Sequence, residues 1–164
     1  TVKIIFICTH NSRRSQFSQV WAHVSSLYFK LDFIKPFSGG TEIDTVNLNV
    51  IKSLINSGLK IEKTHKEDAM YLLKPFKEYK GINLYSKEYS CKSNPTKHFI
   101  AIMTCSDADK MCPVIKGADK KVSLPYPDPR VADNTGLEEE VYNQTCSIIA
   151  KEMFYLMKQV KKIV

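Results

Sequence analysis

The residues best suited to chemistry lie near the start of the chain, where five residues separate Cys8 from Arg14 and Ser15 follows. A thiolate is a strong nucleophile, and a guanidinium can donate two parallel hydrogen bonds to an oxyanion. The stretch connects an apolar run to a helical pattern, so its backbone N–H groups and the helix dipole would face a common centre. We therefore expect Cys8 to be a nucleophile and the following residues to hold a tetrahedral oxyanion: Thr9, His10, Asn11, Ser12, Arg13, Arg14 and Ser15.

A simpler interpretation is that Cys8 is a buried cysteine at a strand end and Arg14 a surface residue. A cysteine and an arginine at this spacing are common by chance. The full string, with Arg-Ser at a junction between strand and helix, is rarer. The position of the string in the chain therefore favours the catalytic interpretation.

The flanking sequence predicts the elements that place this loop. Residues 2–8 form an almost continuous apolar run, which is typical of a strand buried on both faces of a parallel sheet. Phe17, Val20 and Val24 then recur at helical spacing. Similar patterns predict strands at residues 33–37, 99–104 and 122–125, and helices at residues 48–55 and 141–163. Strands that alternate with helices indicate an α/β fold, in which ligands bind beyond the carboxyl ends of the strands.

The ends of the helices carry their own signals. Gly58 is a suitable cap for the helix at residues 48–55, and residues 135–138 (Thr-Gly-Leu-Glu) form a capping-box pattern before the last helix. Residues 62–95 are rich in Lys, Tyr, Ser and Asn. We expect irregular structure there, with a helical tendency at residues 69–73.

Composition limits the kind of protein. The 164 residues are 43% apolar and 25% charged, which suits one globular domain over residues 1–164. The net charge of +7 reflects surface lysines and would attract anions. The lysines are scattered, without zinc-finger spacing or an aromatic RNA-binding signature, so we expect no nucleic-acid partner. No apolar run is long enough for a membrane span or a signal peptide, so we expect a cytoplasmic protein. We also expect a monomer.

Five cysteines, an odd number without secretory context, argue against a disulfide scaffold. None lies in a Cys-x-x-Cys pair and no histidine pair has ligand spacing, so we expect no metal site. Cys146 falls on the apolar stripe of the last helix and should be a core residue. Cys91 receives no role.

The loop resembles that of the low-molecular-weight protein tyrosine phosphatases, and more closely that of the thioredoxin-coupled arsenate reductases that share their fold. Residues 38–42 (Ser-Gly-Gly-Thr-Glu) resemble the family's Ser-Ala-Gly segment, and residues 47–49 (Asn-Leu-Asn) its Asn-Pro-Asn helix start. His10 stands where the family has glycine, and Arg13 where it has cysteine. The resemblance implies a three-layer α/β/α fold around a four-stranded parallel sheet, with residues 66–97 as an insertion.

The resemblance also assigns roles further along the chain. Asp128, before Pro129, would be the general acid that protonates the leaving oxygen, although Asp-Pro alone suits a turn. Cys105 and Cys112, seven positions apart, match the redox segment of the arsenate reductases. In the implied relay Cys105 attacks the sulfur of Cys8, Cys112 forms a disulfide with Cys105, and thioredoxin reduces that disulfide. The segment that carries both thiols must then move.

Three functions stay open at this point. The first is arsenate reduction with thioredoxin as external reductant and no resident cofactor. The second is hydrolysis of phosphotyrosine or small phosphate esters, which would need only Cys8, Arg14 and Asp128. The third is a non-catalytic oxyanion-binding or redox-sensing module. In the phosphatases a pair of tyrosines commonly follows the Asp-Pro motif, whereas residues 130–133 here are Arg-Val-Ala-Asp. The absence of these tyrosines argues against a dedicated tyrosine phosphatase.

Overall fold

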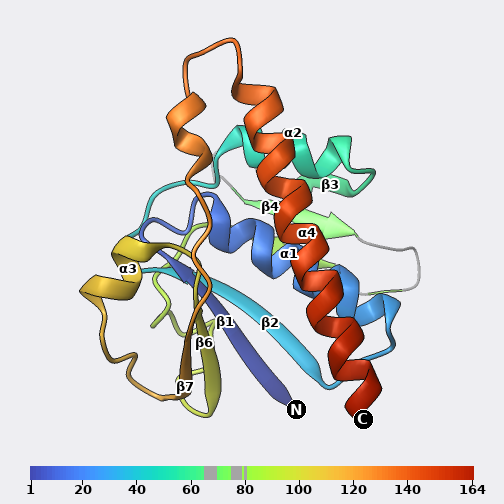
Figure 1. The fold of residues 1–164 in the computed structure, drawn as a ribbon, viewed down its shortest axis with the longest axis vertical. Helices are drawn as coiled ribbons and strands as arrows, with labels where there is room; N and C mark the ends of the chain where they lie inside the picture. The colour runs from blue at the N-terminus through green and yellow to red at the C-terminus, as the bar shows by residue number, and fades with distance from the viewer. Residues whose placement is uncertain (65–69, 75–78, 80) are drawn as a thin grey trace.

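A four-stranded parallel sheet forms the centre of the computed structural model, which describes residues 1–64, 70–74, 79 and 81–164 (Figure 1). The strands lie in the order β2-β1-β6-β7. Their bounds are β1 Val2–Cys8, β2 Ile34–Gly40, β6 Phe99–Met103 and β7 Ala118–Ser123. β1 pairs with β2 and β6, which explains its continuous apolar run. Because the strands are parallel, Cys8 and Gly40 end at the same edge of the sheet.

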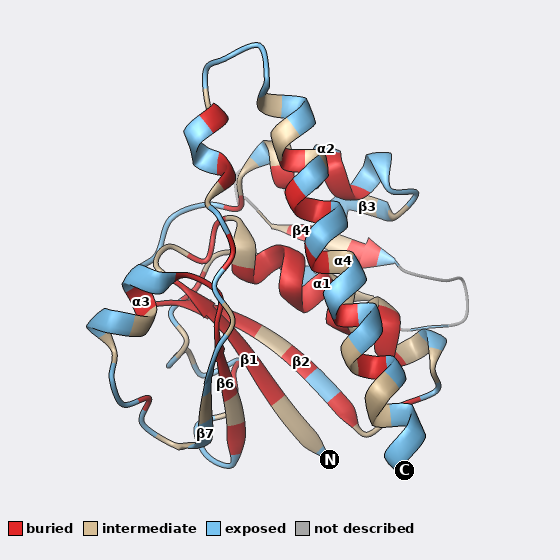
Figure 2. Ribbon diagram, viewed as in Figure 1, coloured by how far each residue is buried: buried red, intermediate tan, exposed pale blue. Residues whose placement is uncertain are grey.

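Helices cover both faces of this sheet. Ile4 and Phe6 of β1 belong to the core shared with α1 (Arg14–Tyr28), α2 (Leu48–Asn56) and α4 (Glu138–Ile163). Ile5 and Ile7 face the other way and pack with residues of α3 (Ser106–Met111) and with Tyr89. Buried residues accordingly fill β1, β6 and the inner sides of α1 and α4 (Figure 2). The predicted three-layer fold is confirmed.

Most predicted elements are present with shifted ends. The last strand, β7, begins at Ala118 instead of residue 122, because an edge strand with exposed lysines carries little apolar signal. Gly58, with φ of +90°, follows α2 as predicted. The predicted capping box is wrong in detail, since α4 begins at Glu138. The Thr135 hydroxyl accepts from the Leu137 N–H, while the Glu138 carboxylate accepts from the Asn134 N–H.

The expectation of irregular structure at residues 62–95 is confirmed for residues 85–95 and is wrong for part of the preceding stretch. A three-stranded antiparallel sheet lies there, in the order β3 (Lys60–Lys63), β4 (Tyr71–Lys74) and β5 (Ile82–Leu84). Tyr71 and Leu73 alternate into the main core, which is strand periodicity and not the helical tendency inferred for residues 69–73. Ala69 lies outside the described residues. That residues 66–97 form an insertion stays a prediction.

Within the described residues, none of the helices combines the length and the apolar character that crossing a lipid bilayer requires.

The core at the junction of α2 and α4 gives a direct test of the fold. Leu54 is fully buried there, so Leu54→Ala should lower the free energy of unfolding by about 2–5 kcal/mol. Leu48, on the same helix, is 63% exposed, and Leu48→Ala should change it by less than about 0.5 kcal/mol. Urea unfolding measures both values. Equal losses would contradict this placement of α2.

Candidate active site

The loop between β1 and α1 orients the Cys8 thiol through a chain of side chains. The Cys8 Sγ lies 3.0 Å from the Ser15 Oγ, and the Asn11 Nδ2 donates to that same oxygen at 2.8 Å. Because the Ser15 oxygen accepts from Asn11, its own proton is free to point at the sulfur. Asn11 has φ of +49°, a left-handed conformation that asparagine tolerates. A thiolate at Cys8 would thus meet a fixed hydrogen-bond donor.

A distant segment, residues 85–89, supports the loop from outside. The Lys87 N–H donates to the Asn11 Oδ1 at 3.0 Å, and the Ser86 hydroxyl donates to the His10 carbonyl at 2.9 Å. The Gln16 Nε2 bridges the Asn11 and Tyr85 carbonyls at 2.9 and 3.1 Å. Sequence reasoning missed these residues, because most of these contacts use backbone atoms that leave no mark on residue type.

The end of β2 also borders the loop. A Cβ atom at Gly40 would lie 2.6 Å from the Thr9 carbonyl oxygen, closer than real Cβ atoms come to other heavy atoms. Gly40 is therefore required for β2 to approach the loop. This close approach gives a physical reason for the Ser-Gly-Gly segment that the sequence comparison singled out.

Arg14 and Asp128 face each other at the edge of the loop. The Arg14 Nη2 lies 2.6 Å from the Asp128 Oδ2, and the Nη1 donates to the Tyr126 carbonyl at 3.2 Å. The Arg14 Nε is buried and has no hydrogen-bond partner among the described residues. A buried guanidinium N–H without a partner suits a group that binds a substrate oxygen. The structure thus brings together the predicted oxyanion ligand and the predicted acid.

Arg13 points elsewhere, although it was predicted to bind the oxyanion. Its Nε donates to the Tyr142 hydroxyl at 2.7 Å, and its Nη2 lies 2.8 Å from the Asp133 Oδ2. Burial lowers the pKa of Arg13, but the hydrogen bond to Tyr142 and the charges of Tyr142 and Asp133 outweigh this, and the net pKa is raised. Its side chain is thus engaged away from Cys8.

His10 lies 3.3 Å from the Glu42 carboxylate and is partly exposed.

Cys105 lies beside the loop, as the relay requires. Its Sγ is 3.5 Å from the Thr9 hydroxyl and also accepts from the Ala108 N–H at the start of α3. Cys112 follows α3 at its other end. Asp109 on α3 forms an ion pair of 2.6 Å with Lys121 on β7, and hydrogen bonds from Lys121 and Ser123 lower the pKa of Asp109. In this conformation Cys105 is buried and Cys112 is partly exposed.

All five cysteines are free thiols. Cys146 is buried on α4 and accepts a hydrogen bond of 3.2 Å from the Trp21 indole, which agrees with the predicted packing role. Burial raises the pKa of Cys146, so it is a poor nucleophile. Cys91 lies outside the loop and accepts a hydrogen bond from the Ser93 hydroxyl.

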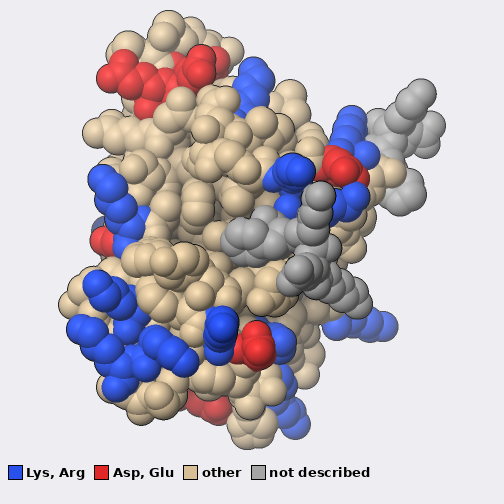
Figure 3. Space-filling model, turned by 90° about the vertical axis from the view of Figure 1, so that its right-hand side faces the viewer, with Lys and Arg blue, Asp and Glu red and all other residues tan. Residues whose placement is uncertain are grey.

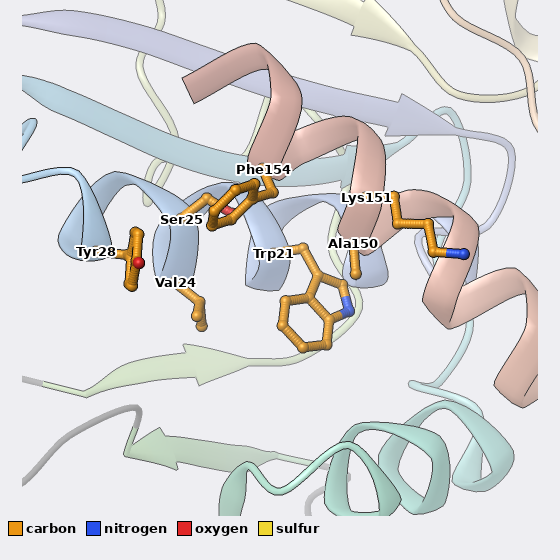
Figure 4. Close-up of a pocket in the computed structure, with 7 residues that line it drawn as sticks. All are labelled: Trp21, Val24, Ser25, Tyr28, Ala150, Lys151 and Phe154. Carbon is orange, nitrogen blue, oxygen red and sulfur yellow. The ribbon is translucent and has the colours of Figure 1, made fainter. Parts of the chain in front are cut away.

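A groove between α1 and α4 is lined mainly by apolar side chains, among them Trp21, Tyr28 and Phe154 (Figure 4). None of the predicted site residues lines this groove. Figure 3 shows a group of Lys and Arg side chains at the lower left of the drawn face and others along its right side. Over the described residues, no cluster of three or more His, Cys, Asp or Glu side chains is placed to hold a metal ion.

Comparison with known proteins gives relatives of two kinds. No family model matches the sequence. Arsenate reductase 2 of Staphylococcus epidermidis is 30% identical over 128 residues, 77% of each chain. Among solved structures, a low-molecular-weight phosphotyrosine phosphatase from Vibrio cholerae has a TM-score of 0.69 at 13% identity, covering 98% of this chain and 97% of its own. An arsenate reductase in its phosphate-binding state has a TM-score of 0.61 at 17% identity, covering 97% and 98%. The resemblance predicted from the sequence is confirmed.

Lys87, which supports the loop, provides a test based on pH. Its side chain is 6% exposed, its Nζ lies 4.3 Å from the Tyr85 ring centroid, and burial lowers its pKa from 10.5 to about 8. Between these pH values the unfolded chain keeps a proton that the folded chain has lost, so raising the pH favours folding. We expect Lys87→Met to remove a rise of up to about 3 kcal/mol in the free energy of unfolding between pH 8 and pH 10.5.

Lys92→Met is the matched control, because it removes the same charge from a side chain that is exposed in the folded protein. Urea unfolding at intervals of pH measures all three proteins. Curves for the wild type and Lys87→Met that run parallel over this range would contradict the burial of the Lys87 ammonium.

Proposed function

Because this chain belongs to the arsenate reductase family, whose members share the fold of the low-molecular-weight protein tyrosine phosphatases, we propose that it reduces arsenate to arsenite through Cys8. The observation that carries the proposal is the position of the Cys105 sulfur, 3.5 Å from the hydroxyl of the residue next to Cys8. A phosphatase needs only Cys8, Arg14 and Asp128. A second thiol beside the loop therefore supports a reductase.

The first step uses the loop. The Cys8 thiolate attacks arsenic, while Arg14 and the backbone N–H groups of the loop neutralise the oxygens. Asp128 protonates the departing oxygen, which leaves as water. In the free protein the Arg14 Nη2 is paired with Asp128, and a bidentate grip on the oxyanion through Nε and Nη2 would take this nitrogen from Asp128.

The thiol relay follows. The Cys105 thiolate attacks the Cys8 sulfur, and the electron pair of the sulfur–arsenic bond passes to arsenic, which leaves as arsenite. Cys112 then attacks Cys105, which releases the Cys8 thiolate and forms a Cys105–Cys112 disulfide. The dithiol of thioredoxin reduces that disulfide. The proposal includes thioredoxin as external reductant, no resident cofactor, and a monomer that works in the cytoplasm.

The relay demands a change in α3. Cys105 and Cys112 stand at opposite ends of this helix, and seven helical steps of about 1.5 Å each span about 10 Å. A disulfide requires Cα atoms within about 7 Å. Helix α3 must therefore unwind, and the Asp109–Lys121 ion pair is a contact that unwinding would break.

Phosphatase activity is the second candidate, because Cys8, Arg14 and Asp128 fit ester hydrolysis equally well. Arsenate and phosphate are nearly isosteric, so one loop should accept both. The segment after Pro129 lacks the tyrosine pair common in the phosphatases, and its exposed Val131 offers an aromatic ester little to bind.

A thiol count after reaction separates the two candidates. Reduced protein is mixed with a small excess of arsenate, without reductant, and disulfides are mapped. We expect the loss of two thiols, a Cys105–Cys112 disulfide and about one arsenite per chain. Five persisting thiols together with hydrolysis of an aryl phosphate would make the chain a phosphatase.

Substitutions of single thiols test the order of the relay. Cys8→Ser should abolish arsenate reduction and ester hydrolysis together. Cys112→Ser should spare ester hydrolysis and stop arsenate reduction after about one turnover, because the Cys8–Cys105 disulfide then has no resolving thiol. Cys91→Ser should leave both activities unchanged. Continued turnover by Cys112→Ser with thioredoxin would contradict the three-thiol relay.

Asp128→Asn removes the proposed acid while keeping its size. We expect the kcat/KM for phenyl phosphate to fall by about 10²–10⁴. The kcat/KM for 2,4-dinitrophenyl phosphate, whose leaving group needs no proton, should fall much less. A similar fall for both esters would count against Asp128 as the general acid.

A further inference from the structure

Two neighbouring arginines hold the two ends of one short turn. The turn is η1 (Pro129–Ala132), with Asp128 before it and Asp133 after it. Arg14 pairs with Asp128 at 2.6 Å, and Arg13 pairs with Asp133 at 2.8 Å. Both arginines stand where the oxyanion loop enters α1. The turn that carries the proposed acid is thus attached at each end to the loop that carries the nucleophile.

The attachment through Arg13 is closed into a ring of hydrogen bonds. Arg13 donates to the Tyr142 hydroxyl at 2.7 Å, and Tyr142 donates to the Asp133 Oδ1 at 2.6 Å. Tyr142 is fully buried on α4, so its ring cannot shift without disturbing the core. The side chains of Arg13 and Asp133 are 13% and 23% exposed, which limits screening by solvent. These three residues therefore form a brace between the loop, η1 and α4.

The two ion pairs must behave differently during the reaction. The buried Nε of Arg14 lacks a partner among the described residues, and a bidentate grip on an oxyanion through Nε and Nη2 would compete with Asp128 for the Nη2. Arg13 is held by Asp133 and Tyr142 and has no such competitor. We therefore expect the pair at Asp128 to open when an oxyanion occupies the loop, and the pair at Asp133 to remain.

We propose that Arg13 is a positioning residue, which keeps Asp128 beside the leaving group while Arg14 binds the oxyanion. The inference rests on the proposed function, since it presumes Asp128 as the acid. It also replaces the earlier expectation that the Arg13 side chain is itself an oxyanion ligand. The cysteine that related loops have at this position is short and uncharged, and could not pair with Asp133.

The kinetic test compares esters that differ in their need for an acid. Arg13→Met should lower the kcat/KM for phenyl phosphate about tenfold or more and that for 2,4-dinitrophenyl phosphate by less than about twofold. The inhibition constant of inorganic phosphate should stay unchanged. Arg13→Lys, which can still pair with Asp133, should recover part of the loss, and Asp133→Asn should reproduce it.

Lys158→Met is the matched control, because Lys158 is exposed on α4 and its side chain makes no hydrogen bond or ion pair in the described structure. It should leave both esters unaffected. Weaker inhibition by phosphate in Arg13→Met, with an unchanged ratio between the esters, would identify Arg13 as an oxyanion ligand and overturn the proposal. An equal fall in kcat/KM for both esters would show that Arg13 serves only the stability of the fold, and would also overturn the proposal.

Hydrogen exchange gives a measurement that needs no turnover. The Val131 and Asp133 amides donate within η1, to the Asp128 and Arg130 carbonyls. Arg13→Met should speed their exchange more in protein saturated with inorganic phosphate than in free protein, because Arg14 then no longer holds Asp128. Equal acceleration in both states overturns the brace. Failure of the wild type to release arsenite overturns the proposed function alone, so the two results are distinguishable.

Discussion

The burial of β1 on both faces is the constraint on which the site depends. Ile4 and Phe6 are fixed in one core and Ile5 and Ile7 in the other, so the strand has no freedom to shift in register or direction. Cys8 ends this strand and is itself buried. The packing of the sheet therefore also fixes the position of the nucleophile. The following loop then only has to surround the Cys8 sulfur.

Two negative groups compete for the Arg14 guanidinium beside the loop. Asp128 pairs with it in the free protein, and an oxyanion would bind it in the complex. In the free protein the ion pair with Asp128 shields the buried guanidinium from the cost of lying unpaired. The same carboxyl group is needed later as an acid, so the contact that stabilises the free site must open for the reaction.

The sequence predicts the parts of the molecule in which residue type reports burial. The runs at residues 2–8 and 99–104 identify two strands, and the stripe of α4 places Cys146 in the core. It fails where a strand is short, as in β4, because two buried residues two positions apart are too few to establish a strand pattern within a polar stretch. The sequence also gives no sign of the hydrogen bond from the Lys87 N–H to Asn11, because almost any residue type has a backbone N–H. Arg13 was assigned to the loop correctly, but its direction depends on Asp133 and Tyr142, residues that lie more than a hundred positions away.

The proposed relay requires one fixed thiol and one thiol that moves. Cys8 must be held still, whereas Cys105 must leave a buried position to meet Cys112. The fold separates them by element. Cys8 ends a strand of the sheet's interior, while Cys105 and Cys112 flank a helix of six residues that isolated would not be stable. What holds α3 is the packing of Ala108 in the core cluster of Ile5 and Ile7, and its ion pair to Lys121. If these contacts are released, β1 keeps its pairing with β2 and β6. The relay is therefore compatible with a rigid loop around Cys8, because the motion falls on α3, which is the shortest α-helix of the described chain.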